Sequence, residues 1–573
     1  MSKITLTIDE QEIQVEEGTT ILEAAREVGI DIPTLCYHPD LTLHGSCRVC
    51  VVENLDNDSL VASCVTPAAD GMNLSTRSAR ARRARGRNVK LLLANHPNDC
   101  LGCDRNGTCE LQDIVYKMGI RREEIEPLEG EKRNLPLDDR GPALKRDPNK
   151  CILCGRCVRV CEEVQGVSAL QFSKRGFDSV VTTAFDLPQS EINCANCGQC
   201  ATVCPVGAIT EISEIDKVWH ALEDPDKHVI VQTAPAIQAT IGEEFGLEAG
   251  TVVTGKLVNA LRKLGFDRVF STEFSADLTI MEEGYEFLDK VENNKPLPHI
   301  TSCCPGWIKY AEHNYADLLD NISTAKSPQQ MFSPLVKTYY AEKSDIDPAN
   351  IYTVSVMPCT AKKFEKDREE MVDSGYKDTD AVLTTRELAR MIKEVGIDFN
   401  NLADDEYDEL MGKSTGAGTI FGTTGGVTEA ALRTVKEKLT GEPLERLNLG
   451  IRGIKEAEVE IGDLVVNVAV ASGLGNAAKL LDEVRAGNSK YHWIEIMACP
   501  HGCVGGGGQP LPVNNEKKDK RAEGLASVDK NKYVRKSHEN PMVQKLYDDF
   551  LGEPLADKSH KLLHTHFKAR AKN

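Results

Sequence analysis

The first thirty residues alternate between apolar and polar positions with the period of β-strands. Apolar residues occupy every second position over residues 4–8 and again over residues 13–15, with a charged stretch between them. This alternation predicts a β-hairpin. Thr19 or Thr20 can cap a following helix, and Gly29 can end it. The sequence therefore predicts a hairpin, a helix and then a loop rich in cysteine.

From about residue 212 the pattern changes to short apolar runs separated by helical stretches. The runs that indicate buried strands are VIVQTAP, RVFSTEF, IYTVSVMP, DLVVNVAVASG and WIEIMAC, and the helical stretches include ALRKLG, EAALRTVKEKL and NAAKLLDEVRAG. Such alternation is typical of an α/β core, and no long charged linker divides it. We therefore expect one α/β domain over residues 212–573, as a single body or as two lobes with a cofactor between them.

Length, charge and cysteine content narrow the class of protein. A chain of 573 residues should hold several domains, at roughly 150 residues each. The formal net charge of −20 argues against nucleic-acid binding, and the basic run over residues 77–87 is interpreted as a solvated helix face. No secretory signal and no stretch of ~18 apolar residues is visible. We expect a cytoplasmic protein whose 20 cysteines bind metal rather than form disulfides.

The first cysteines follow the predicted helix with the spacing C-x10-C-x2-C-x13-C. They are Cys36, Cys47, Cys50 and Cys64. Four thiolates suit a 2Fe–2S cluster, and a structural zinc site is the alternative. The preceding hairpin and helix favour the cluster, because the same order of elements opens a plant-type ferredoxin. Residues 1–78 thus resemble the N-terminal β-grasp ferredoxin domain of the large iron–sulfur subunit of respiratory complex I and of hydrogenases.

A second motif has the spacing H-x3-C-x2-C-x5-C and comprises His96, Cys100, Cys103 and Cys109. A lone histidine is usually surface or core filler, but this one precedes a CxxC pair by four residues. The spacing resembles the His-ligated 4Fe–4S site of the same two families, and zinc bound by three cysteines and one histidine is the alternative. We assign this motif to a small domain over residues 79–140.

The strongest spacing signal is an internal repeat whose halves both read C-x2-C-x2-C-x3-C. This is the signature of bacterial two-cluster ferredoxins, in which the fourth cysteine of each run binds the other cluster. We therefore expect a two-4Fe–4S domain over residues 141–211. One cubane would take Cys151, Cys154, Cys157 and Cys204, and the other would take Cys161, Cys194, Cys197 and Cys200.

Three short segments place five cysteines in a C-terminal region that otherwise has none: TSCCPGW (301–307), MPCTAKKFE (357–365) and EIMACPHGCVGGGGQP (495–510). They resemble the three signature segments of the iron-only (FeFe) hydrogenases, and with the N-terminal motifs the resemblance covers essentially the whole chain. Four of these cysteines can hold one more 4Fe–4S cubane: Cys304, Cys359, Cys499 and Cys503. The glycines after the last of them let backbone approach a bulky cofactor.

The resemblance implies an H-cluster, in which a cubane is joined to a two-iron unit carrying CO, cyanide and a dithiolate amine. Cys503 would bridge the two parts, and the Lys362 ammonium would donate a hydrogen bond to a cyanide. The activity implied is reversible H₂ oxidation and proton reduction, with electrons relayed through one 2Fe–2S and three accessory 4Fe–4S clusters. Further residues would line the cofactor: Ala234, Pro235, Gln329, Met357 and Met497.

A proton path is implied as well. Cys303 is the one cysteine without a ligand role, and a thiol pKa of ~8.5 suits a relay, although an inert buried cysteine is the alternative. Glu283, Glu286 and Lys290 share one face of a predicted helix, which alone would indicate a solvated acidic face. By resemblance, Glu283 and Glu286 occupy proton-wire positions together with Ser323. Lys290 stands at the outer end, where the family usually has arginine.

Partners and alternative functions follow from the same comparison of motifs. Two N-terminal domains resemble the electron-collecting end of complex I, so we expect a flavin–NAD(P)-binding subunit in a larger, electron-bifurcating complex. A ferredoxin-dependent enzyme that works alone is the alternative, and maturation proteins are expected in either case. A non-enzymatic iron–sulfur scaffold and an H₂ sensor are less favoured because of Lys362 and Cys303. The GxGxxA pattern at residues 473–478 is interpreted as a tight turn, and no nucleotide site is expected.

Overall fold

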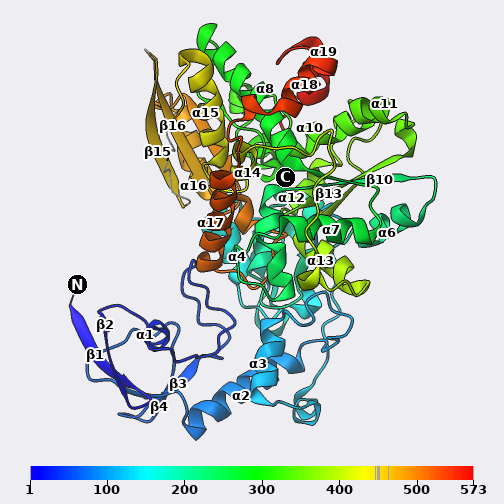
Figure 1. Ribbon diagram of the computed structural model, residues 1–573. Helices are drawn as coiled ribbons and strands as arrows, with labels where there is room; N and C mark the ends of the chain where they lie inside the picture. The colour runs from blue at the N-terminus through cyan, green and yellow to red at the C-terminus, as the bar shows by residue number, and fades with distance from the viewer. Residues whose placement is uncertain (1, 445–446, 448–451, 463, 572–573) are drawn as a thin grey trace.

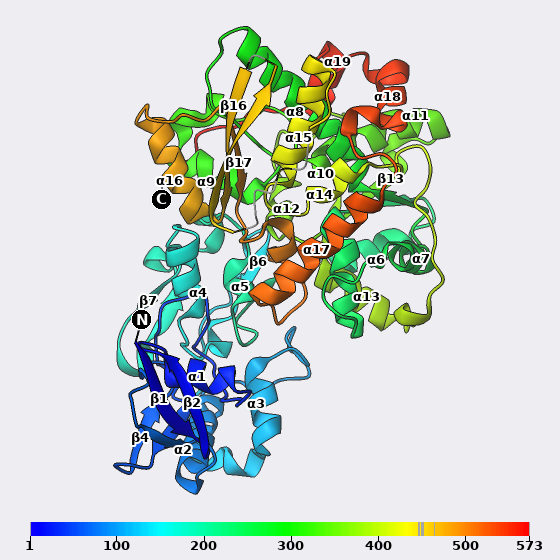
Figure 2. The ribbon, with the colours of Figure 1, turned by 60° about the vertical axis from the view of Figure 1, so that its left-hand side comes forward.

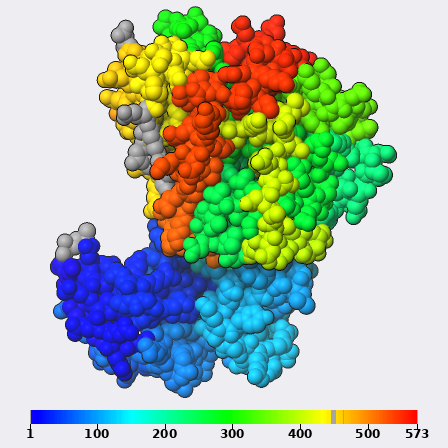
Figure 3. Space-filling view, viewed as in Figure 1, coloured from blue at the N-terminus to red at the C-terminus, as the bar shows by residue number. Residues whose placement is uncertain are grey.

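The computed structural model describes residues 2–444, 447, 452–462 and 464–571. Figure 1 shows the N-terminal part of the chain, in blue and cyan, below a larger C-terminal body, and Figure 3 shows the first residues as a distinct blue lobe. The arrangement is the multidomain α/β fold that the sequence predicts. Among the described residues, none of the helices combines the length and apolar character that crossing a membrane requires.

The N-terminal lobe is a five-stranded sheet with one short helix. Its strand order is β2-β1-β5-β3-β4, with β1 and β2 antiparallel and β1 and β5 parallel. The Thr20 side chain caps the helix and forms a capping box with Glu23, which confirms the predicted start. The bounds are β1 Lys3–Ile8, β2 Gln11–Glu16, α1 Ile21–Glu27, β3 Val51–Asn54, β4 Ser59–Ala62 and β5 Asn73–Ser75.

Two helices, α2 (Ala79–Ala94) and α3 (Glu110–Met118), follow the sheet. The interpretation of the basic run as a solvated face is wrong at one position. Arg85 is 8% exposed and donates hydrogen bonds to the backbone oxygens of Val51 and Thr76. Its guanidinium therefore ties α2 to the preceding sheet instead of facing water.

The cysteine repeat folds into a pseudo-symmetric unit. Each half places a left-handed glycine, Gly155 or Gly198, directly before a short helix, with φ of 72° and 74°. Two small antiparallel sheets, β6-β9 and β7-β8, complete the unit. Its elements are β6 Leu144–Arg146, α4 Arg156–Arg159, β7 Gln171–Ser173, β8 Val180–Thr182, α5 Gln199–Thr202 and β9 Ile209–Glu211.

The C-terminal body contains two four-stranded sheets, and we call each sheet with its covering helices a lobe. The first sheet is entirely parallel, in the order β11-β10-β13-β14, and the second has the order β12-β17-β16-β15, with only β15 antiparallel to its neighbour. All five predicted strands are confirmed, whereas β12, β14 and β15 were not predicted. The bounds are β10 His228–Thr233, β11 Arg268–Ser271, β12 His299–Ile300, β13 Ile351–Met357, β14 Ala381–Thr384, β15 Ile454–Ile461, β16 Leu464–Ser472 and β17 Trp493–Met497.

Helices cover both sheets and fill the space between them (Figure 2). The long helix α8 contacts α10, α14 and α15, and α14 also contacts α17. The bounds are α6 Ile215–Glu223, α7 Thr254–Leu264, α8 Thr272–Glu292, α9 Pro305–Asn314, α10 Pro328–Leu335, α12 Ala361–Glu365, α13 Thr385–Glu394, α14 Gly416–Ile420, α15 Gly426–Thr440, α16 Leu474–Arg485, α17 Asn515–Asn531, α18 Pro541–Leu546 and α19 Asp557–Leu563.

The GxGxxA segment is a tight turn only at Gly473, because helix α16 begins at Leu474, and this helix start packs against the two-cluster unit. A Cβ atom on Gly475 would lie 2.9 Å from the backbone oxygen of Val164. The backbone N–H of Leu474 donates to Gln165 Oε1 at 3.4 Å. The start of α16 is thus covered by protein, and its glycines serve close packing between two parts of the chain.

Candidate active site

A buried cavity of about 80 Å³ lies between the two lobes of the C-terminal body. Its cysteines come from loops that directly follow β12, β13 and β17, and Ala234 directly follows β10. The carboxyl ends of parallel strands meet at one edge of a sheet, and in α/β folds such edges form ligand sites. The fold therefore explains how segments nearly 300 residues apart in sequence come together.

The cavity wall contains every residue that the sequence analysis assigned to the cofactor, together with Cys303, which it assigned to the proton path. These are Ala234, Pro235, Cys303, Cys304, Gln329, Met357, Cys359, Lys362, Met497, Cys499 and Cys503. The wall also contains residues that the sequence analysis missed, because small and apolar residues without regular spacing give no signal. Among them are Thr272, Ala276, Pro328, Phe421 and Gly422.

The donor set of the cavity fits a four-thiolate cubane with an attached inorganic group. Four thiols from three segments converge there, and an apolar wall surrounds them. Gly506 lets two of the cysteine-bearing loops pack closely, since a Cβ atom on it would lie 2.2 Å from the Pro358 oxygen. Gln329 Oε1 is buried and has no hydrogen-bond partner among the described residues. An acceptor of this kind suits a polar ligand that the cavity would hold.

Lys362 is the cationic group of the cavity. Its ammonium donates to Ser327 Oγ at 2.7 Å, to Glu365 Oε2 at 2.8 Å and to the Cys303 backbone oxygen at 3.3 Å. Burial acts to lower the pKa of Lys362, but the neighbouring Glu365 carboxylate outweighs it and raises the pKa. The side chain therefore stays charged inside an otherwise apolar wall.

The repeat cysteines meet in the two groups that the crossed ligand pattern requires. One small cavity is lined by Cys151, Cys154, Cys157 and Cys204, and a second by Cys161, Cys194, Cys197 and Cys200. In the N-terminal lobe, Cys50 Sγ and Cys64 Sγ lie 3.3 Å apart, and Cys36 contacts Cys47 and Cys64. Each group supplies four sulfur atoms, as iron–sulfur clusters require.

His96 has a free ligand atom. Its Nε2 is buried without a hydrogen-bond partner in the described part of the chain. Burial lowers the pKa of His96 to about 4, so the imidazole is neutral, which is the form that binds metal. Of its proposed companions, Cys103 interacts with both Cys100 and Cys109.

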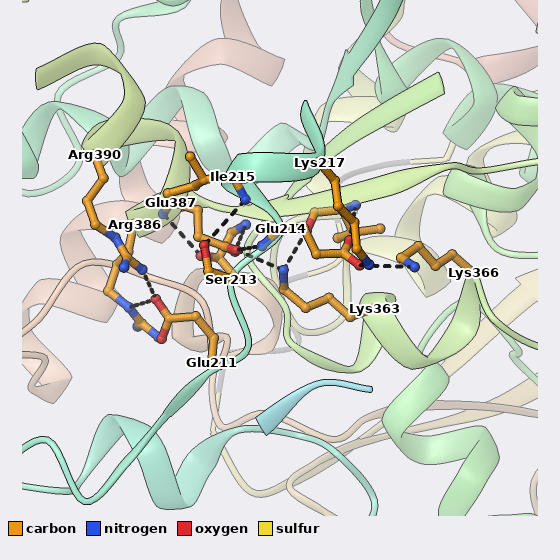
Figure 4. A network of polar contacts seen from close by, with 12 residues as sticks. Glu211, Ser213, Glu214, Ile215, Lys217, Lys363, Lys366, Arg386, Glu387 and Arg390 are labelled. Carbon is orange, nitrogen blue, oxygen red and sulfur yellow. Dashed lines mark hydrogen bonds and ion pairs between the residues drawn. The ribbon is translucent and has the colours of Figure 1, made fainter. Parts of the chain in front are cut away.

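A buried ionic network joins the two-cluster unit to the C-terminal body (Figure 4). Glu211, at the end of β9, accepts from Arg386 Nη2 at 2.6 Å and from Arg390 Nη2 at 2.5 Å. Arg386 also donates to the backbone oxygens of Gly507 and Gln509 in the glycine run. Burial acts to raise the pKa of Glu211, but Arg386 outweighs it and holds the pKa below its usual range. The network thus fixes the glycine run relative to the electron-carrying unit.

The predicted proton-path residues lie together next to the cavity and are not a solvated face. Glu283 is fully buried and Glu286 is 8% exposed. The Ser323 hydroxyl donates to Glu286 Oε2 at 2.6 Å and also interacts with Glu283, and the Ser302 backbone N–H donates to Glu283 Oε1 at 3.3 Å. Burial, assisted by the charge of Glu286, raises the pKa of Glu283 to about 8.

Two further residues complete this region. Lys290 is 7% exposed, lies 3.9 Å from Glu286 and donates to the Asn321 backbone oxygen. The sequence analysis missed His299, whose Nε2 lies 3.8 Å from Glu283 Oε1. Both ring nitrogens of His299 are buried without a hydrogen-bond partner among the described residues. No motif marks this histidine, and only the fold brings it beside Glu283.

Models of known families match the chain from end to end. Residues 227–507 match the C-terminal domain of the iron-only hydrogenase large subunit, and residues 515–570 match the iron hydrogenase small subunit. Residues 1–79 match a 2Fe–2S cluster binding domain. Residues 85–124 match the iron–sulfur binding region of NADH-ubiquinone oxidoreductase G, and residues 141–210 match the ferredoxin-like domain of NADH-quinone oxidoreductase subunit 3. The N-terminal third therefore consists of iron–sulfur domains, and the remainder carries the H-cluster fold.

Individual relatives agree with these matches. The NADP-reducing hydrogenase subunit HndD of Solidesulfovibrio fructosivorans is 49% identical over 586 aligned positions, covering 100% of both chains. Iron hydrogenase 1 of Clostridium pasteurianum is 43% identical, covering 98% of this chain and 100% of the relative. A structure of the FeFe-hydrogenase HydA1 of Chlamydomonas reinhardtii has 44% identity and a TM-score of 0.58, covering 62% of this chain and 99% of the other. This chain belongs to the iron-only hydrogenase family.

Proposed function

We propose that this hydrogenase moves protons between its cavity and the surface along Cys303, Glu283, Ser323 and Glu286. The observation that carries the proposal is the Ser323 hydroxyl, which interacts with both buried carboxyl groups. A hydroxyl can accept a proton on one side while it donates one on the other. Because the pKa of Glu283 lies near 8, this group can hold and release a proton near neutral pH.

The cavity residues support a specific division of roles. When bound, the H-cluster would supply the site at which H₂ is split or formed. Cys304, Cys359, Cys499 and Cys503 would hold it, and Cys503 would bridge its two parts. Lys362 would orient a charged ligand through its ammonium, while Met357 and Met497 keep water away from the wall. Ala234, Pro235 and Gln329 would complete the contact surface.

Electrons would travel through the N-terminal domains, which we place at residues 1–78, 79–140 and 141–211, to the catalytic domain at 212–573. One cluster would be held by Cys36, Cys47, Cys50 and Cys64, a second by His96, Cys100, Cys103 and Cys109, and two more by the repeat cysteines in their crossed groups. The spacing of ligands and the convergence of their sulfur atoms support these ligand groups.

We further propose that the chain works as the hydrogen-converting subunit of an NAD(P)-linked complex. A relative that spans the whole chain is an NADP-reducing hydrogenase subunit, and two N-terminal segments match iron–sulfur regions of NADH oxidoreductases. Such a complex requires a flavin-containing partner that exchanges electrons with the first domains. A hydrogenase that works alone with ferredoxin is the competing possibility.

Gentle purification from the native host separates these two possibilities. Co-elution of a flavoprotein, together with NAD(P)-linked H₂ activity, supports the complex, whereas a single chain that uses only ferredoxin contradicts it. In the complex, deletion of residues 1–78 should weaken NAD(P)-coupled activity more than activity with an artificial dye. Equal losses with both acceptors would show that the first domain does not receive the partner's electrons.

A further inference from the structure

Glu286 has a second set of polar contacts that the proton path described so far does not use. Thr324 Oγ1 lies 3.4 Å from Glu286 Oε1 and 2.8 Å from Nδ1 of His564. The Thr324 backbone N–H also donates to both Glu286 oxygens at 3.1 Å. The Thr324 hydroxyl is thus shared between a wire carboxyl group on α8 and an imidazole in the C-terminal segment, where α18 and α19 pack beside α8 (Figures 1 and 2).

The other edge of the imidazole determines its hydrogen positions. His564 Nε2 lies 3.0 Å from Glu282 Oε2, and Glu282 also accepts from the Tyr547 hydroxyl and the Leu555 backbone N–H. Glu282 is fully buried. Tyr547 and Leu555 both donate to this carboxyl group, which fits an ionised carboxylate that can only accept. His564 Nε2 therefore carries its hydrogen, and Nδ1 turns a lone pair toward Thr324.

We propose that Thr324 and His564 form a second outer branch of the proton path, which starts at Glu286 and leads into the C-terminal segment. The proposal rests on the proposed role of Glu286. When Glu286 is protonated, its O–H bond breaks as the proton passes to Thr324 Oγ1, and the hydroxyl's own proton passes to His564 Nδ1. The products are a Glu286 carboxylate and an imidazolium that faces the Glu282 carboxylate. The reverse sequence brings a proton inward for H₂ formation.

The branch ends just below the surface, because His564 is itself 4% exposed. Thr324 is half-buried, and the His564 ring stacks on the exposed His560 with centroids 4.7 Å apart. Lys290, at the other end of Glu286, is 7% exposed, and an ammonium offers donors but no acceptor. The titratable groups that interact with His564, with its stacked neighbour His560 or with Glu282 include the Glu286 carboxyl group, the His566 imidazole and the Tyr547 phenol.

A first experiment separates proton transfer from a purely structural role. His564→Ala in the full, cluster-loaded protein should lower H₂ turnover by about tenfold, and free imidazole in the buffer should restore much of it, because the deleted ring leaves room for one. Tyr547→Phe is the matched control, since it removes a hydrogen bond to Glu282 but leaves the contact between Thr324 and His564. A similar loss in both variants, without imidazole rescue, would show that the cluster only holds the C-terminal segment in place and would overturn the proposal.

A second experiment tests whether two branches act in parallel. If Lys290 and His564 serve separate branches, each can replace the other. The fold loss of activity in the double variant of Lys290→Met and His564→Ala should then exceed the product of the two single fold losses. A double variant no slower than Lys290→Met alone would exclude the branch. Glu286→Gln distinguishes the two proposals. If Glu286→Gln is inactive while His564→Ala is fully active, only the branch is refuted. If Glu286→Gln is fully active, the proton path on which the branch rests is refuted as well.

Discussion

The backbone oxygen of Cys197 lies 4.0 Å from the sulfur atom of Cys499. Cys197 lines one of the two repeat cavities and Cys499 lines the central cavity, so the two proposed cluster sites adjoin. Gly198 and Gly507 permit this approach: a Cβ on Gly507 would lie 2.6 Å from the Cys197 oxygen. If both sites hold clusters, the last step of electron transfer would depend on these two glycines as well as on the ligands.

Gly198→Ala should disturb this contact. The new Cβ would lie 2.5 Å from Thr360 Oγ1 and 2.9 Å from the Gly507 Cα atom, at a φ of 74° that side chains rarely adopt. We expect a destabilisation of about 1–3 kcal/mol and a lower H₂ output per intact H-cluster. Thermal unfolding, iron counts and dye-driven H₂ evolution measure these effects.

Gly176→Ala is the matched control, because Gly176 also has a positive φ, of 61°, but nothing lies within 4 Å of its Cβ position. It should reproduce only the backbone cost of about 1 kcal/mol. If Gly176→Ala reduces H₂ output as much as Gly198→Ala does, the close approach of the two sites has no special role.

Cys303→Ser should keep all clusters and lower turnover by about 100-fold or more. Cys303 lines the cavity, and the backbone N–H of the preceding residue, Ser302, donates to Glu283. A serine hydroxyl is far less acidic than a thiol, so it gives up its proton much more slowly. The measurement is H₂ evolution by protein whose infrared bands and iron content match those of the wild type. Turnover near the wild-type level in such protein would remove Cys303 from the path.

Glu283→Gln should slow turnover strongly and also change how stability depends on pH. The native carboxyl group keeps its proton up to a pKa of about 8, whereas the unfolded chain releases it near the ordinary value of 4.5. Between these values the unfolded state binds fewer protons, so this group lowers stability as pH rises, by at most about 1.4 kcal/mol per unit. An amide cannot titrate, so the variant should gain stability relative to the wild type as pH rises toward 8.

Melting temperatures across this pH range, with Glu292→Gln as control, test the assignment. Glu292 is exposed on the same helix, and its replacement should leave the pH dependence as it is in the wild type. If the melting temperatures of Glu283→Gln and of the wild type change with pH in the same way, Glu283 is ionised in the native protein.

The sequence predicted most of the fold and the site because both depend on residues with strong local signals. Cysteine spacing indicated how the repeat sulfur atoms would group, and strand periodicity located β10, β13 and β17, whose ends position the cavity. The residues that were missed carry no such signal. His299 reaches Glu283 only through the pairing of β12 with β17, and His564 reaches Thr324 from 240 residues away. Arg85 belongs to a basic run, and only the tertiary fold shows that one arginine of that run points inward.

The last prediction concerns the ligand set of the second cluster. His96→Cys should leave this cluster bound but lower its reduction potential, because a charged thiolate would replace a neutral imidazole and would stabilise the oxidised form. The buried, unpartnered Nε2 of His96 supports its role as a ligand. A redox titration monitored by electron paramagnetic resonance measures the potential of this cluster. The potentials of the other clusters should stay unchanged. His38→Cys is a suitable control, because burial also lowers the pKa of that histidine to about 4 although it belongs to no ligand motif. If His96→Cys leaves every potential unchanged, or raises that of this cluster, then His96 is not a ligand.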